Sequence, residues 1–332
     1  MSYTFGCNVT QKQLDALPTT LAKLVISPPS GLSKGKQAKK LNLARFEKIQ
    51  ELEVKYEQIE SMPASVAKLY VRGDCSDLNR FLVQGVECLR IDHVDFEVEY
   101  GPFKVPSTMK RLDLCDFHFC ASELDFSQAS SLEYLRLDGV YDAEMQEKVS
   151  IDLRSCALLK ELHIWNLGVM DEGAYNIPNL HLLTHLTISI APQLVLDQCT
   201  SLVYLCLRLN SEREYCWGWN EVDHDTLVLK MPKTLLSLKH HSRSGQICVL
   251  DITECSMLQL FGYSTFEVPG TLCEHQRVIG LDQCRFIVDF ECYAHLNSPL
   301  PSGVRNISTT PLNRFSDHQT ENCKELVLFS YE

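Results

Sequence analysis

Hydrophobic residues recur along this chain in a short pattern that repeats at irregular intervals. Apolar side chains occupy the third and sixth positions after a register residue, and in most copies also the eighth; the register residue is Pro in one group and Cys or Ala in another. The clearest copies begin at Pro18, Pro63, Pro106, Ala129, Cys156, Cys199, Pro232, Cys255 and Cys323. The same register fits at Phe46, Val83, Leu180, Cys284 and Pro301. This gives about 14 copies with a mean spacing of about 23 residues, inside the range of known repeat architectures.

Each copy predicts a short β-strand, because its sixth and eighth positions alternate with polar residues at a period of two. Pro suits the turn into such a strand, where its missing N–H costs nothing and its fixed φ lowers the turn's entropy. A second motif pairs apolar residues with Asp, and copies of it start at Leu124, Ile151, Leu194, Leu250 and Leu281. It predicts short strands or extended turns on the opposite side of the repeat. Helical periodicity is expected only in residues 33–51 and 141–148.

The segment Leu202-Val-Tyr-Leu205-Cys-Leu207-Arg-Leu-Asn210 matches the pattern LxxLxLxxN, so the chain resembles the leucine-rich repeat (LRR) family over nearly all its length. The Asn position usually holds another residue, such as Val94, Phe117 or Val140. The resemblance is therefore to divergent, irregular repeats, loosely like fungal and protist LRR proteins. It implies that residues 1–332 form a single α/β (β-rich) leucine-rich-repeat solenoid, with a curved parallel sheet on the concave side. Short strands, turns and few helices are expected on the convex side.

No polar capping segment follows the last copy, so we expect either that the last coil is itself the cap or that the chain belongs to a longer array. The 48 leucines, more than an ordinary domain of this length contains, agree with a repeated hydrophobic pattern.

The charge and cysteine content narrow the class of protein. The net charge of −12 argues against a general binder of nucleic acid or acidic membranes, because phosphate contacts need Lys and Arg. The chain starts without a basic segment followed by an apolar run, and no stretch is long and apolar enough to span a membrane. We therefore expect a cytoplasmic location, with the nucleus as an alternative. The 15 cysteines are then expected to be reduced and often buried, whereas a secreted recognition protein would form disulfides.

The sequence lacks several common metal-binding, catalytic and nucleotide-binding motifs. It has no CxxC, and the closest groupings lack the paired spacing of a zinc site: Cys115, His118 and Cys120; Cys273 and His275; Cys284, Cys292 and His295. It has no GxSxG, GxxxxGK[ST], GxGxxG or HExxH motif. We therefore expect no catalytic residues, no metal and no cofactor.

One segment suggests a different role. Residues 17–24 resemble the start of an F-box, which would make the protein a substrate-recognition subunit of a ubiquitin ligase. The same residues fit the Pro-led repeat register equally well.

The fifth, seventh and ninth positions of each copy are the candidate binding surface. Parallel strands lie about 4.8 Å apart, so these positions form one continuous patch, and Tyr, Trp and Arg dominate binding hot spots. The predicted concave-face residues are Tyr70, Arg72, Arg90, Arg111, Tyr134, Arg136, His163, Trp165, His185, Tyr204 and Arg208. The longest interval between copies adds a predicted loop contact at Tyr215, Trp217 and Trp219.

The competing interpretation of the patch is an ordinary solvated face on which Arg and Asp pair across strands. The function we expect is a non-enzymatic protein–protein interaction scaffold that binds a protein or peptide, and that is monomeric apart from this partner. No nucleic acid and no membrane is expected as a partner.

Overall fold

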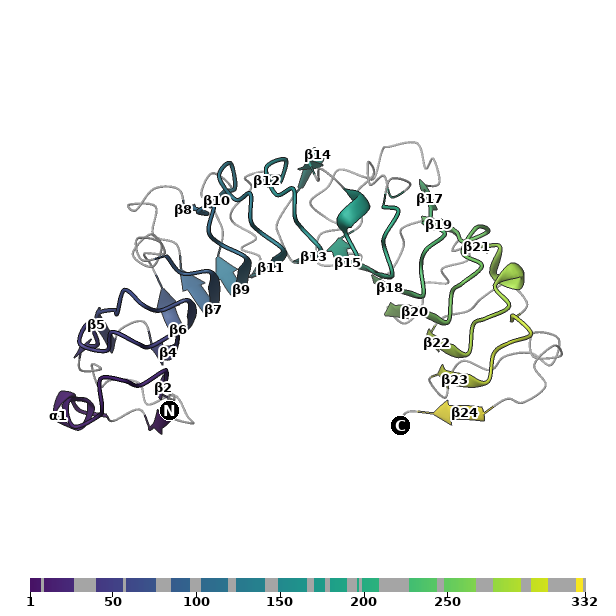
Figure 1. The fold of residues 1–332 in the computed structure, drawn as a ribbon. Coiled ribbons are helices and arrows are strands. Elements are labelled where there is room, and N and C mark those ends of the chain that lie inside the picture. Colours follow the sequence, from purple (N-terminus) through teal and green to yellow (C-terminus); the bar gives the residue numbers. More distant parts are fainter. Residues whose placement is uncertain are drawn as a thin grey trace. The chain divides into compact units, whose positions relative to one another are not determined.

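The computed structural model describes residues 1–6, 9–26, 40–55, 58–75, 85–95, 103–118, 124–140, 149–165, 170–176, 180–189, 196, 199–208, 227–243, 248–266, 277–293, 300–309 and 327–330. In these residues the chain is rich in β-strands and has few helices (Figure 1). It divides into two compact units, Met1–Leu159 with Asn166–Pro178 and Lys160–Trp165 with Asn179–Glu332. The expected single solenoid of about 14 repeats stays a prediction.

The first unit is built on a row of long parallel strands. In spatial order they are β1 (Ser2–Phe5), β2 (Lys23–Ile26), β4 (Glu51–Lys55), β6 (Lys68–Cys75), β7 (Cys88–Asp95), β9 (Arg111–His118) and β11 (Tyr134–Val140). Short parallel pairs lie on the opposite side (Figure 1): β3 (Leu41–Asn42) with β5 (Ile59–Ser61), β8 (Phe103–Lys104) with β10 (Leu124–Asp125), and β12 (Val149–Asp152) with β14 (Met170–Asn176). Helix α1 (Gln11–Asp15) precedes β2 and carries a capping box between Thr10 and Gln13.

The second unit repeats this plan. Its long strands are, in order, β13 (Glu161–Trp165), β15 (His185–Ser189), β16 (Tyr204–Arg208), β18 (Ser237–Arg243), β20 (Leu260–Phe266), β22 (Asp289–Tyr293), β23 (Asn306–Thr309) and β24 (Val327–Ser330). Its short strands are β17 (Leu227–Lys230), β19 (Cys248–Asp251) and β21 (Arg277–Ile279). Two single-turn 3₁₀ helices, η4 (Leu180–Leu182) and η5 (Leu281–Gln283), complete the described elements.

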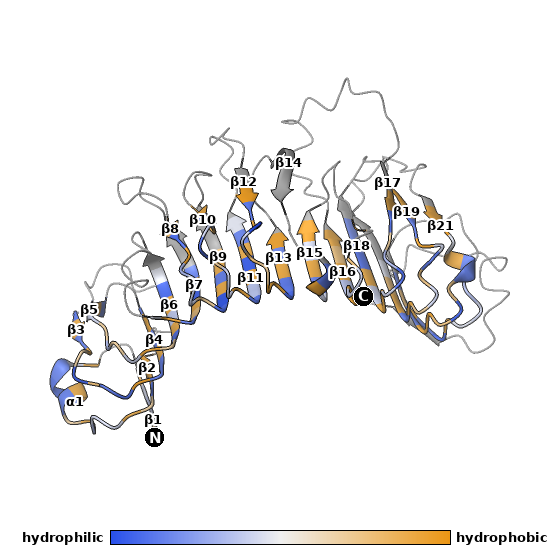
Figure 2. Ribbon diagram, turned by 45° about the horizontal axis from the view of Figure 1, so that its top comes forward, coloured by the Kyte–Doolittle hydropathy of each residue, from blue (hydrophilic) through white to orange (hydrophobic). Residues whose placement is uncertain are grey.

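The predicted register is confirmed by the strand pairing. Residues at the sixth position stand opposite one another from strand to strand, and each is at most 2% exposed. In the first unit they are Leu24, Leu52, Leu69, Leu89, Leu112 and Leu135. In the second they are Leu162, Leu186, Leu205, Leu238, Phe261, Phe290 and Ile307. Figure 2 shows the resulting alternation of hydrophobic and hydrophilic residues along strands such as β9.

Backbone hydrogen bonds explain why the copies form two groups. In both groups the carbonyl of the register residue accepts from the amide three residues later, as in Met109 to Pro106 at 3.0 Å. Where the register residue is Cys or Ala, its own amide also donates to the carbonyl three residues earlier, as in Cys156 to Leu153 at 2.8 Å. Pro has no N–H, so Pro-led copies lack this earlier turn.

The Asp of the second motif ends an outer strand. Asp125, Asp152 and Asp251 each accept a hydrogen bond from the backbone amide two residues later, at 2.8, 3.0 and 3.1 Å. This is an Asx turn, the usual way in which Asp stabilises a reversal of the chain. Hydrogen bonds from the side chains of Ser127, Arg154 and Thr253, together with these backbone hydrogen bonds, lower the pKa of the three carboxyl groups.

Three local predictions are wrong. In the last copy, Leu328 pairs with Ile307 and Phe329 with Ser308, one residue away from the register that starts at Cys323. A continuous apolar run from Leu326 to Phe329 cannot define the alternation. The motif at Leu281 forms η5 instead of a strand or extended turn.

The third wrong prediction is the helix over residues 33–51, of which 40–51 are described. These form β3, two turns and the start of β4, because that conformation buries Leu41, Leu43, Phe46 and Ile49 completely. Residues 33–39 and 141–148 lie outside the described residues.

Seven of the cysteines in the described part of the chain are free thiols, and six of these are buried: Cys115, Cys156, Cys199, Cys206, Cys255 and Cys284. Burial raises the pKa of Cys156 and of Cys255 to about 12, so these two thiols stay protonated and act as small apolar groups. Within the described residues, no helix has the length and apolar character needed to cross a membrane.

Candidate interaction surface

The structure distributes the predicted binding residues over both units. In the first unit, Tyr70 and Arg72 lie on β6, Arg90 on β7, Arg111 on β9, and Tyr134 and Arg136 on β11. In the second unit, His163 and Trp165 lie on β13, His185 on β15, and Tyr204 and Arg208 on β16. The side chains of Trp165 and Arg208, and the whole loop with Tyr215, Trp217 and Trp219, lie outside the described part of the chain.

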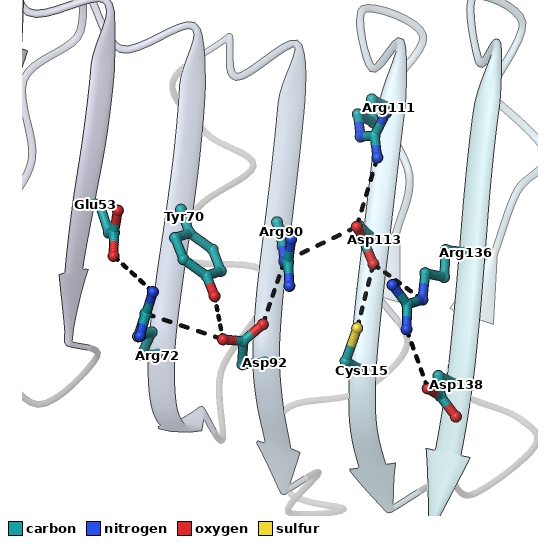
Figure 3. A network of polar contacts seen from close by, with 10 residues as sticks. All are labelled: Glu53, Tyr70, Arg72, Arg90, Asp92, Arg111, Asp113, Cys115, Arg136 and Asp138. Carbon is teal, nitrogen blue, oxygen red and sulfur yellow. Dashed lines mark hydrogen bonds and ion pairs between the residues drawn. The ribbon is translucent and has the colours of Figure 1, made fainter. Parts of the chain in front are cut away.

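The first-unit residues join a continuous network that we call the polar ladder (Figure 3). Its members come from five neighbouring strands, β4, β6, β7, β9 and β11, and basic residues contact acidic ones along its length. They are Glu53, Tyr70, Arg72, Arg90, Asp92, Arg111, Asp113, Cys115, Arg136 and Asp138. Four arginines balance four carboxylates, so the ladder is neutral as a whole.

Tyr70 is the centre of one end of the ladder. Its hydroxyl donates a hydrogen bond to Asp92, and its ring lies between the guanidinium groups of Arg72 and Arg90, 4.8 and 4.9 Å from the ring centroid. Arg90 Nε is 3.2 Å from Asp92 Oδ1, and Arg72 Nη2 is 2.9 Å from Glu53 Oε1. Burial and the hydrogen bond to Asp92 raise the pKa of Tyr70 to about 12, so this hydroxyl remains a donor at any physiological pH.

Asp113 is the centre of the other end. Its side chain is 1% exposed, and three guanidinium groups surround it: Arg90 at 3.9 Å, Arg111 at 3.7 Å and Arg136 at 3.7 Å. The thiol of Cys115 donates to Asp113 Oδ1 at 3.3 Å. A carboxylate can be buried only when it is compensated in this way. Burial and the Asp113 charge raise the pKa of Cys115 to about 12.

The ladder holds its arginines in place, and Arg90 and Arg111 are the most exposed of the four. The side chains of Arg90 and Arg111 are both 48% exposed. Arg111 also lies over the ring of Tyr134, 3.5 Å from its centroid, which is a close cation–π contact. Both arginines therefore keep N–H donors available on the outer surface in a restricted geometry.

The second unit has smaller polar contacts on the corresponding strand positions. His163 Nδ1 is 3.0 Å from Thr187 Oγ1, and the rings of His185 and Tyr204 stack at 5.8 Å. Further along the sheet, Lys239 Nζ on β18 is 3.0 Å from Glu291 Oε2 on β22, although β20 separates the two strands.

A glycine makes this second contact feasible. At Gly262 on β20, an added Cβ would lie only 3.2 Å from Lys239 Cγ and 3.3 Å from Glu291 Oε2. Any larger residue would push the two side chains apart.

The pairing of Arg with Asp across strands, which was the alternative prediction for this face, is present in the first unit. In each unit some of these strand positions are also closed to solvent: Asp113 and Cys115 are buried in the first, and Thr187 and Cys206 in the second. Sequence reasoning missed Glu53, although it stands at the seventh position after Phe46 and the register could have found it. Among the described residues, no group of three or more His, Cys, Asp and Glu side chains is arranged to hold a metal ion.

No protein-family model matches the chain, and no curated protein sequence matches it.

Proposed function

We propose that this chain is a non-enzymatic interaction scaffold, a divergent LRR solenoid that binds a protein or peptide on the sheet face carrying the polar ladder. We call this surface the ladder face: the described residues at the fifth, seventh and ninth positions of the repeat copies that contain β2, β4, β6, β7, β9 and β11. The observation that carries the proposal is the presentation of Arg90 and Arg111, each half exposed and held by neighbouring groups.

Restricted arginines suit binding because association costs conformational entropy. A flexible side chain loses about 0.5–1.5 kcal/mol of free energy when an interface immobilises it. Arg111 has already lost part of its conformational freedom in the folded protein, because Tyr134 and Asp113 restrict it, so it loses less on binding. Arg and Tyr are also residue types that concentrate binding energy in interfaces.

The fold supports the same class of function. Rows of parallel strands with a repeated buried pattern build extended surfaces that many repeat proteins use for binding. This support is an analogy, because a fold does not determine a function. A ubiquitin-ligase role remains a prediction; residues 17–24, where the F-box resemblance lies, contain a turn at Pro18 and the first residues of β2.

Affinity capture from native cell extract tests the proposal. The wild type is compared with the double variant Arg90→Ala/Arg111→Ala, and with Lys104→Ala, which removes an exposed charge from β8 on the opposite side. We expect a specific partner whose recovery falls about 30-fold or more with the double variant, since hot-spot truncations cost about 2 kcal/mol or more. Lys104→Ala should retain it.

Melting curves of all three proteins control for folding. Equal recovery with all three would place the contact elsewhere. Recovery of ligase adaptors with all three would favour the ubiquitin-ligase interpretation instead.

A further inference from the structure

We propose that the partner contributes an acidic polypeptide segment, which binds where strands β6, β7 and β9 begin, between Lys68 and Arg111. This inference rests on the proposed function and specifies the chemistry of the partner.

The ladder face is positive although the chain is negative. Its described positions carry seven basic and five acidic side chains, a surplus of two positive charges, whereas the whole chain has a net charge of −12. The polar ladder is neutral, and Lys23 pairs with Glu51. The surplus is therefore Lys55 and Lys68, and no ion pair within the described residues reaches either of them.

Lys68 and Arg111 lie close enough to act together. Lys68 pairs in register with Cys88, and Cys88 pairs with Arg111, so the two basic residues flank Cys88 on neighbouring strands. The charges of Lys68, Arg111 and Lys110 all act on the Cys88 thiol, although burial outweighs them and raises its pKa. Lys110 is neutralised by Glu87 at 2.7 Å, which leaves Lys68 and Arg111 as the effective positive charges.

Arg111 has donors to offer a carboxylate. Among the described residues its one acidic neighbour is Asp113, whose Oδ2 is 3.7 Å from Nη2, beyond hydrogen-bond distance. Its guanidinium is planar with five N–H donors and lies over the ring of Tyr134. A carboxylate approaching from solvent could accept two of these donors, which is the strongest geometry for such a pair.

The spacing fits an extended acidic peptide. Lys68 and Arg111 are two strands apart, which corresponds to about 10 Å, and carboxylates three residues apart on an extended chain are also about 10 Å apart. A long polyanion such as nucleic acid would be repelled by a chain of net charge −12. A short acidic segment can use the local surplus of positive charge.

Fluorescence anisotropy with defined probes tests this. The probe is a dye-labelled peptide with Glu at every third position among Gly and Ser, compared with matched Gln and Lys peptides and with a single-stranded oligonucleotide. We expect the Glu peptide to bind about tenfold or more tightly than the Gln peptide, and less tightly as salt rises.

Two pairs of variants locate the site. Cys88→Glu should weaken binding of the Glu peptide about tenfold relative to Cys88→Gln, because the two differ only in charge. Lys68→Glu should do the same relative to Lys233→Glu, which makes an equal change in net charge at an exposed turn of the second unit. Lys68 is exposed, so its replacement leaves the fold intact.

The inference is overturned if the Glu peptide binds no better than the Gln peptide, if the paired variants behave alike, or if the oligonucleotide binds more tightly. Failure here is distinguishable from failure of the proposed function. A partner captured by the wild type and lost with Arg90→Ala/Arg111→Ala would sustain the scaffold, even when no acidic peptide binds.

Discussion

Replacing the buried histidine of β18 with leucine should remove much of the acid sensitivity of folding. His240 stands at the eighth position after Pro232, where its partner on the neighbouring strand β16 is the buried Leu207. It is 1% exposed, and burial, with a further contribution from the charge of His241, lowers its pKa to about 4. The unfolded chain binds this proton near the ordinary histidine pKa of about 6.5.

The sign and size of the effect follow from this difference. Because the folded pKa lies below the unfolded one, the unfolded state binds more protons between these values, and stability falls as the pH falls from about 6.5 to about 4. One pKa unit corresponds to about 1.36 kcal/mol, so the full loss is about 3 kcal/mol. Between pH 7.5 and pH 5.5 the loss is about 1.3 kcal/mol.

Urea unfolding followed by circular dichroism at pH 7.5 and 5.5 measures this loss. The window lies above the range in which carboxylates ordinarily titrate. His240→Leu should lose about 1.3 kcal/mol less stability than the wild type across the window. His181→Gln, which removes an exposed imidazole from η4, is the matched control and should retain the wild-type loss. Equal acid sensitivity in His240→Leu and wild type would refute the burial argument.

Three further predictions concern the repeat and the ladder. Leu205→Ala should destabilise by about 2–5 kcal/mol in urea unfolding, whereas Leu158→Ala, at a 45% exposed position, should change stability by less than about 0.5 kcal/mol; similar values would refute the register. Gly280→Ala should lower the melting temperature, because Gly280 has a φ of 83° and a Cβ would lie 2.5 Å from Thr253 Cα; an unchanged melting temperature would show that this turn is not constrained. Asp113→Asn should lower the free energy of unfolding by about 1–3 kcal/mol. This is less than the cost of breaking a fully buried ion pair, because water can hydrate Arg90 and Arg111. A gain in stability would show that the charge at Asp113 opposes folding.

The repeat register could be predicted because hydrophobic burial determines it. The sixth-position residues, such as Leu112 and Leu205, must all face the same side for the strands to pack, and a slip of one residue would expose them. The same register places His240 in the core although the residue is polar. Where the pattern is ambiguous, as in the apolar run that contains β24, the prediction slipped by one position.

The contacts and burial of the polar side chains on the ladder face could not be predicted from the sequence in the same way. The register places Arg90, Asp113 and Arg136 in one row, but side-chain period alone does not show which polar group is covered by its neighbours. Asp113 is buried because long arginine side chains from both sides reach over it, and this depends on rotamers that the sequence pattern does not specify. Lys68 can be identified as an unbalanced positive charge only after the ion pairs of the other charged residues on the ladder face are known.

Site-specific photo-crosslinking in native cell extract tests the central claim most directly. Benzoylphenylalanine replaces Cys88, which lies between Lys68 and Arg111 on the ladder face, in one protein and Lys104 on β8, on the opposite side, in another. A scaffold that binds through the ladder face should give a defined crosslinked polypeptide from position 88 and none from position 104. A crosslink from position 104 alone, or the same products from both positions, would contradict the account.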